Sequence, residues 1–209
     1  MSMKSLNKLS IWLLALFSIC IGLYPLVYIY VDNSVGLLSS KSPETLASPI
    51  WRLCFYTHIS FGGLALLVGW SQFIKSIRLK YRLWHIRIGY IYMVSVLLSG
   101  LSSIFISFYT TGGFISGLGF FCLGIVWLVT TILAFFHVLK KDHLKHQEFM
   151  TYSYAACFAA VTLRIWLPLL ALLFGDFISA YLLVAWLCWI PNLIVAHSIN
   201  KRNLKYGIQ

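Results

Sequence analysis

The stretch from Phe114 to Val138 reads FISGLGFFCLGIVWLVTTILAFFHV and contains no Asp, Glu, Lys or Arg. A helix needs about 20 predominantly apolar residues to cross the hydrocarbon core of a bilayer, which is about 30 Å thick. Lipid offers no hydrogen-bond partners, so a segment of this kind must satisfy its backbone groups internally, as an α-helix does. We therefore expect this stretch to be a transmembrane α-helix.

Five further stretches have the same apolar character. The chain's 209 residues are 60% hydrophobic and 10% charged, against about 25% charged in soluble domains, which excludes a soluble fold of this length. Short connections favour antiparallel neighbours, so we expect one helical domain over residues 1–209 with a four-helix core at residues 53–174. The sequence predicts an all-α, polytopic integral membrane bundle whose six transmembrane helices run over Ser10–Val31, Leu53–Ile74, Ile86–Phe108, Phe114–Val138, Phe149–Phe174 and Phe177–His197.

The basic residues are unevenly distributed between the connections. The net charge is +11, and thirteen of the 16 Lys and Arg residues lie in or beside the N-terminal segment, the second and fourth connections and the C-terminal tail. Because basic connections stay in the cytoplasm, this alternation predicts that both termini are cytoplasmic. Basic residues between apolar runs contact anionic lipid headgroups, so they do not indicate a nucleic-acid partner.

In three predicted helices a histidine opens a stripe of small or polar residues at helical spacing. These histidines are His58, His85 and His146, and the last stripe continues to Arg164. Polar side chains are costly in lipid and normally face the bundle interior or a cavity. With a rise of about 1.5 Å per residue, His85 and His146 share a depth at the cytoplasmic face, whereas His58 and Arg164 lie near the outer face. The sequence therefore predicts one polar site at each membrane face.

Both sites have side chains that bind cofactors in other proteins. Imidazoles commonly hold haem iron axially, which makes His85 and His146 candidate metal ligands for haem b. His58 and Arg164 are candidate cofactor-binding residues, because a guanidinium pairs with a haem propionate, a quinone oxygen or a lipid phosphate. The alternatives are interfacial solvation for His85 and His146, a structural hydrogen bond for His58, and snorkelling to the headgroups for Arg164.

Other chemical signatures are absent from the sequence. It contains no GxSxG, HExxH or Walker motif and no pair of carboxylates within a span, so it indicates no catalytic residue and leaves open whether the chain is an enzyme. The five cysteines form no CxxC pair, which argues against a zinc site or a disulfide framework. Pro25, Pro168 and Pro191 lie within spans, and each predicts a kink or a satisfied gap in its helix.

Several motifs together resemble one membrane protein family. They are His58, GGLALLVGWSQF at 62–73, WHIRIGY at 84–90, Trp127, HQEFM at 146–150, VTLR at 161–164 and WIPNL at 189–193. The set covers most of the chain and resembles a bacterial family of predicted membrane proteins of unknown function. This resemblance implies the fold and a multi-pass location in the bacterial cytoplasmic (inner) membrane, but no activity. The family pattern has Arg soon after both inner histidines; Arg87 agrees with it, whereas Gln147 and Glu148 depart from it.

Three functions remain open at this point. The first is a haem b protein for electron transfer or haem handling, since the bundle is similar in architecture to transmembrane di-haem b cytochromes. The second is a non-enzymatic scaffold or assembly factor for a respiratory membrane complex, similar to small proteins that assist terminal-oxidase assembly. The third is a small-molecule or lipid carrier that uses Arg164 and the basic rim. The expected partners are the lipid bilayer and a respiratory-chain complex or quinone.

Overall fold

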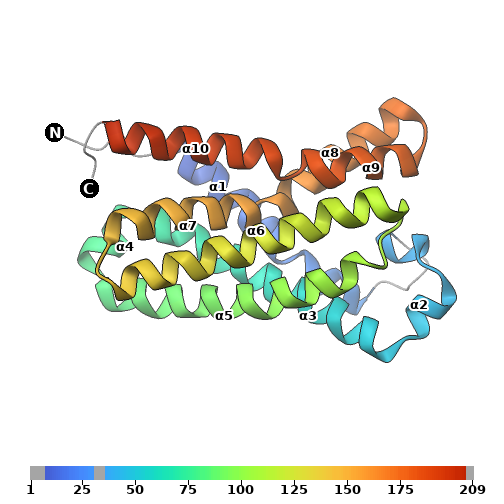
Figure 1. Cartoon of the computed structure of the whole chain (residues 1–209), viewed down its shortest axis with the longest axis horizontal. Coiled ribbons are helices and arrows are strands. Elements are labelled where there is room, and N and C mark those ends of the chain that lie inside the picture. The colour runs from blue at the N-terminus through green and yellow to red at the C-terminus, as the bar shows by residue number, and fades with distance from the viewer. Residues whose placement is uncertain (1–7, 31–35, 206–209) are drawn as a thin grey trace.

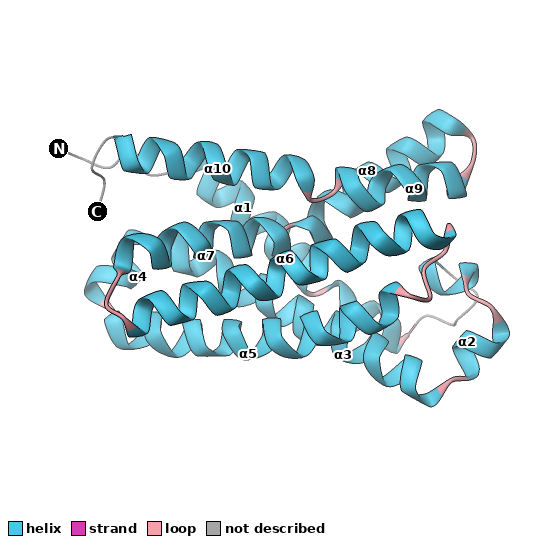
Figure 2. Ribbon diagram, viewed as in Figure 1, coloured by secondary structure: helices cyan, strands magenta, loops and turns pink. Residues whose placement is uncertain are grey.

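The structure of the chain, a computed structural model, describes residues 8–30 and 36–205. Every regular element in these residues is a helix (Figure 2). The elements are α1 (Lys8–Gly22), η1 (Tyr24–Ile29), η2 (Gly36–Ser40), α2 (Pro43–Ala47), α3 (Pro49–Gly69), η3 (Trp70–Phe73), α4 (Lys75–Lys80), α5 (Arg82–Ser107), α6 (Gly113–Leu139), α7 (His143–Cys157), α8 (Ala159–Phe174), α9 (Phe177–Leu187) and α10 (Ile190–Lys205).

Within the described residues, six segments are long and apolar enough to cross a membrane, which confirms the predicted number of spans. They are Leu9–Tyr28, Pro49–Phe73, Arg82–Ser107, Gly113–Leu139, His143–Phe174 and Phe177–Leu204. The predicted end of the first span, Val31, lies outside the described residues. The third and fifth spans begin earlier than predicted, so His85 and His146 are each the fourth residue of their helices, α5 and α7.

The fifth and sixth spans are broken helices, and the sequence predicts a kink or a gap in each of them, at Pro168 and at Pro191. The fifth consists of α7 and α8, which separate at Phe158, and the sixth consists of α9 and α10, which separate at Cys188 and Trp189. Pro191 lies in the first turn of α10, where proline is favoured, but Pro168 lies inside α8. The fifth span therefore breaks well before its proline, and the predicted stripe from His146 to Arg164 is divided between two helices.

One side chain bridges the two breaks. Asn192 Nδ2 donates to the carbonyl oxygens of Cys188 at 2.9 Å and Ala155 at 3.3 Å, and to Thr162 Oγ1 at 3.1 Å. The Thr162 hydroxyl also donates to the carbonyl of Cys188. A broken helix leaves carbonyl groups without intrahelical partners, which lipid cannot supply. These bonds therefore satisfy the backbone where the two spans are interrupted, and they tie the spans together.

The basic connections gather at one end of the bundle. Figure 1 shows α4, the α6–α7 turn and the end of α10 at the left, whereas α2 and the α8–α9 turn lie at the right. Lys75, Arg78, Lys140, Lys141 and Lys201 belong to the elements at the left. We call this end of the molecule the basic end. Successive helices run in opposite directions, as the sequence predicts, so every second connection lies at this end, and these are the connections that carry Lys and Arg.

The largest buried cluster lies between α3, α5, α6 and α7. Leu66 of α3, Val96 of α5, Trp127 of α6 and Cys157 of α7 all belong to it. Gly69, at the end of α3, lies against two buried rings: a β-carbon at this position would come within 2.5 Å of the Tyr154 ring and 2.9 Å of the Tyr92 ring. Small residues allow such close approach of helices in lipid.

A network of buried hydroxyl groups crosses this core. Ser153 Oγ of α7 lies 2.8 Å from the Tyr92 hydroxyl of α5 and 2.6 Å from Thr131 Oγ1 of α6. Trp127 Nε1 donates to the Tyr92 hydroxyl at 3.3 Å. Buried polar groups without partners are costly, so these hydroxyl groups favour arrangements in which they bond to one another. They can do so only when each helix is rotated to point its hydroxyl group at the other two. The network therefore fixes how α5, α6 and α7 face one another, and with them the histidines at the basic end.

Candidate functional site

His85 and His146 both lie at the basic end. Each is the fourth residue of its helix, one on α5 and the other on α7. The His85 imidazole lies within electrostatic range of His146. The structure thus places at one end of the bundle, on two different helices, the two residues that the sequence offers as metal ligands.

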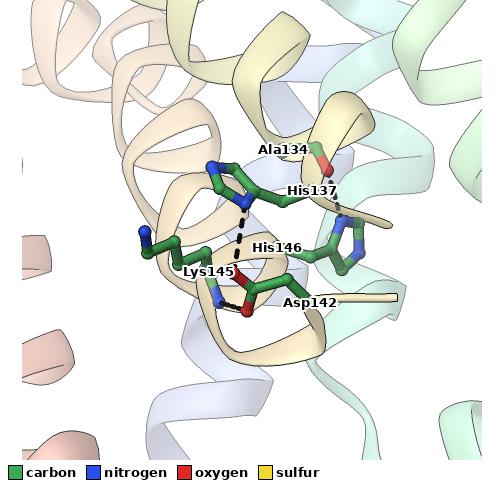
Figure 3. A network of polar contacts seen from close by, with 5 residues as sticks. All are labelled: Ala134, His137, Asp142, Lys145 and His146. Atoms are coloured by element: carbon green, nitrogen blue, oxygen red, sulfur yellow. Dashed lines mark hydrogen bonds and ion pairs between the residues drawn. The ribbon is translucent and has the colours of Figure 1, made fainter. Parts of the chain in front are cut away.

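The ring of His146 is held in one orientation by a backbone carbonyl. His146 Nδ1 lies 2.9 Å from the carbonyl oxygen of Ala134 on α6 (Figure 3). A carbonyl can only accept, so Nδ1 carries the proton and donates it. The neutral ring then has an unprotonated Nε2 with a free lone pair. Histidines that ligate metals usually donate their other ring N–H to a carbonyl or carboxylate in this way.

His85 has an unsatisfied polar atom. Its Nδ1 is buried and has no hydrogen-bond partner among the described residues, and the same is true of Gln72 Nε2 on η3. The two residues lie near the same part of α5, because a β-carbon on Gly89, one turn after His85, would lie 4.0 Å from Gln72 Oε1. Buried polar atoms without partners are rare and often mark the place of a missing water or ligand. The site therefore has hydrogen-bonding capacity that the protein itself does not use.

The other histidines of the basic end have separate roles. His137 Nδ1 lies 3.3 Å from Asp142 Oδ2 (Figure 3), and its ring stacks on Phe149 with 5.4 Å between centroids. Asp142 caps α7 by accepting from the backbone N–H of Lys145 at 3.1 Å. This hydrogen bond, with the nearby His137, holds the pKa of the Asp142 carboxyl below its usual value. His137 and Asp142 thus stabilise the α6–α7 turn through these contacts, none of which uses the His146 ring.

The donor set at His85 and His146 decides which metal group fits. Among the described residues, no three His, Cys, Asp or Glu side chains converge on one point as a metal site. Zinc sites need at least three protein ligands, so two imidazoles do not suffice for a zinc ion. Haem differs, because the porphyrin supplies the equatorial ligands of its iron and the protein adds axial ones. Two imidazoles are therefore too few for a zinc ion, whereas two is the number of axial positions that a haem iron offers.

His58 makes a structural hydrogen bond between α3 and α5. Its Nδ1 lies 3.1 Å from the carbonyl oxygen and 3.0 Å from the Oγ of Ser99, and Ser99 Oγ donates to the carbonyl of His58 at 2.9 Å. Gly62, one turn further on α3, makes room for this pair, since a β-carbon there would lie 3.1 Å from Ser99 Oγ. This arrangement matches the structural alternative that the sequence left open for His58.

Arg164 of α8 belongs to the outer predicted site. It lies within electrostatic range of His58 on α3. The Arg164 guanidinium stands over the Tyr24 ring of η1, with Cζ 4.4 Å from the ring centroid, and Nη1 donates to the carbonyl of Ala160 at 2.8 Å. Its charge therefore stays within the bundle, beside an aromatic ring, and the described hydrogen bonds of His58 and Arg164 go to other partners.

Comparison with known proteins gives one match. A family model described as "Predicted membrane protein (DUF2306)" matches residues 55–199 of the chain. The chain belongs to the DUF2306 family. No curated protein and no solved structure matches it. The function of the DUF2306 family is unknown, so membership establishes a membrane protein and assigns no activity.

The DUF2306 segment contains all four candidate residues but only part of their surroundings. His58, His85, His146 and Arg164 lie within residues 55–199, whereas Tyr24 precedes the matched segment. No pattern in the sequence connects Tyr24 with Arg164, because they belong to the first and fifth spans. The sequence does mark Gln72, because it ends the stripe of small residues that follows His58. Nothing in that stripe indicates that its amide is unsatisfied or that it lies near the same part of α5 as His85.

Proposed function

We propose that this DUF2306 protein binds haem b between α5 and α7, with His85 and His146 as axial ligands, for electron transfer or haem handling. The observation that carries the proposal is the hydrogen bond from His146 Nδ1 to the Ala134 carbonyl. It orients the ring and leaves Nε2 as a lone-pair donor beside His85, whose own Nδ1 has no partner in the described part of the chain. An oriented imidazole with a backbone acceptor behind it is the usual arrangement of a metal-ligating histidine.

The charge of the basic end supports the same proposal. Arg78 of α4 lies within electrostatic range of His85, and Arg82 and Arg87 lie within one turn of it on α5. Haem b carries two propionate groups, and guanidinium groups form strong charge-assisted hydrogen bonds with carboxylates. Arginines near an imidazole pair suit an anionic cofactor better than a bare cation, which they would repel.

We also propose an orientation and a location. The basic end faces the cytoplasm and the α2 end faces outward, in the cytoplasmic membrane of a bacterium. The gathering of Lys and Arg at one end of the bundle supports this orientation through the preference of basic connections for the cytoplasmic side. Attachment of a membrane-impermeant thiol reagent to single cysteines placed in α2 and in the α6–α7 turn tests it: intact cells label the α2 position only.

The haem proposal is tested by absorption spectra of the purified protein, oxidised and dithionite-reduced, after expression in haem-replete cells. We expect a b-type difference spectrum at about one haem per chain. His85→Ala and His146→Ala should each abolish it, because each removes an axial ligand. His143→Ala is the matched control, since His143 is exposed at the same end and should leave the spectrum unchanged. A spectrum that survives both ligand substitutions refutes the assignment.

A well-folded protein without haem would refute the proposal as well. It would favour the second function considered for the chain, a scaffold or assembly factor for a respiratory membrane complex, which needs no cofactor. Co-purification with a larger complex from a mild detergent distinguishes that function from a lipid or small-molecule carrier. Thermal unfolding of each histidine variant shows whether a lost spectrum reflects a lost ligand or a lost fold.

A further inference from the structure

Among the described residues, the Arg164 guanidinium has no counter-ion. The only ion pair in the part of the chain that the structure describes joins His137 and Asp142, at the basic end. Of the five N–H donors of arginine, the described hydrogen bonds use Nη1 alone, toward Ala160. The Tyr24 ring offers a cation–π contact, but the neighbouring His58 adds no negative charge. A cation within a transmembrane helix is costly and normally pairs with another charged group, so this position favours an anionic ligand.

An apolar groove begins beside the same aromatic residues. It has a volume of about 350 Å³ and runs between η1 and α3, lined by side chains that include Leu26, Tyr28, Tyr56, Ser60, Leu64 and Leu67. Tyr28 links the groove to the arginine, because its ring packs edge-on against Tyr24 at 5.9 Å between centroids. The volume lies within the range of small-molecule sites, about 300–1,000 Å³. Several lining residues, Leu26 and Tyr56 among them, are exposed on the bundle surface, where lipid reaches them.

We infer that this region binds one anionic phospholipid, with its phosphate on Arg164 and an acyl chain in the groove. A phosphate accepts several hydrogen bonds from a guanidinium and supplies the missing negative charge. The apolar lining suits a hydrocarbon chain, and the Tyr24–Tyr28 pair forms an amphipathic boundary between the head and the tail of such a ligand. The inference does not depend on haem binding, which concerns residues at the basic end.

Native mass spectrometry and thermal unfolding of the full chain in detergent test the inference, with phosphatidylglycerol as the probe and zwitterionic phosphatidylcholine as the comparison. We expect wild-type protein to retain one phosphatidylglycerol and to unfold at a higher temperature with it than with phosphatidylcholine. Arg164→Gln should weaken phosphatidylglycerol binding about tenfold, since one charge-assisted interaction is lost. Arg164→Lys keeps the charge and should retain a part of the affinity. Ser60→Phe should weaken binding by filling the groove.

The controls separate this site from general attraction to a basic protein. Arg52→Gln removes an exposed arginine of α3 and should leave binding unchanged, as should His85→Ala. Equal losses in Arg52→Gln and Arg164→Gln would overturn the inference, because binding would then follow net charge. Stabilisation by glycerol phosphate alone, or unchanged binding in Ser60→Phe, would overturn the assignment of the groove to an acyl chain. Equal binding of phosphatidylcholine would overturn the requirement for an anion.

Discussion

Replacing Gly69 by alanine tests how tightly the centre of the bundle is packed. The backbone of Gly69 is ordinary right-handed helix, with φ −66°, so alanine meets no conformational penalty there. Its β-carbon, however, would lie 2.5 and 2.8 Å from Tyr154 ring atoms and 2.9 Å from a Tyr92 ring atom. These distances are far inside van der Waals contact, so something must move.

Neither ring can move without losing a buried hydrogen bond. The Tyr154 hydroxyl lies 2.7 Å from Ser18 Oγ of α1, and the Tyr92 hydroxyl lies 2.8 Å from Ser153 Oγ. Overpacking of a core by one methyl group costs about 1–3 kcal/mol, and the helix preference of alanine over glycine returns up to about 1 kcal/mol. We therefore expect Gly69→Ala to lower the free energy of unfolding by up to about 3 kcal/mol, and by up to about 2 kcal/mol if the full helix preference of alanine is returned.

Gly89→Ala is the matched control for this substitution. Gly89 also lies within a transmembrane helix, but the nearest atom to its β-carbon position is Gln72 Oε1 at 4.0 Å. Alanine should therefore be neutral or stabilising there, by up to about 1 kcal/mol. The assay is reversible unfolding of both variants in one detergent, followed by tryptophan fluorescence. Equal stability of Gly69→Ala and Gly89→Ala would refute the packing argument.

Three further substitutions test other parts of the structure. Asn192→Leu should destabilise the protein by about 1–3 kcal/mol, because it removes the amide that donates to carbonyl groups at both helix breaks, although Thr162 still donates to Cys188. Hydrogen exchange of residues 155–162 should rise with it, and unchanged exchange would contradict the bridging role. Tyr92→Phe should cost about 1–2 kcal/mol in thermal unfolding through the lost hydroxyl of the Ser153 network, and a neutral result would show that the network contributes nothing. Burial lowers the pKa of Lys41 to about 8 from its ordinary 10.5, so the unfolded state binds more protons between these values and stability should rise with pH across that window. Lys41→Met should flatten the rise, and a slope equal to that of the wild type would argue against a buried amine.

The sequence located the two predicted sites by the depth of their residues in the membrane. This depth depends only on how far a residue lies from the end of its own apolar run. His85 and His146 could be assigned to one membrane level because each follows a basic connection and begins an apolar run. Their side-chain environments could not be predicted, because the Ala134 carbonyl and Gln72 come from other helices. The same limit applies to Arg164, whose partner ring belongs to η1 in the first span.

The sequence by itself determined the number of spans, their approximate ends and the separation of a basic end from an opposite one. Hydrocarbon imposes these features on each segment independently, through a minimum apolar length and the need for internal backbone hydrogen bonds. Only the tertiary structure decided that the fifth span breaks at Phe158, which carbonyl orients His146, and why Gly69 must be small. Each of these depends on contacts between segments that are distant in the chain, and in lipid such contacts follow from close packing and paired polar groups rather than from a hydrophobic pattern.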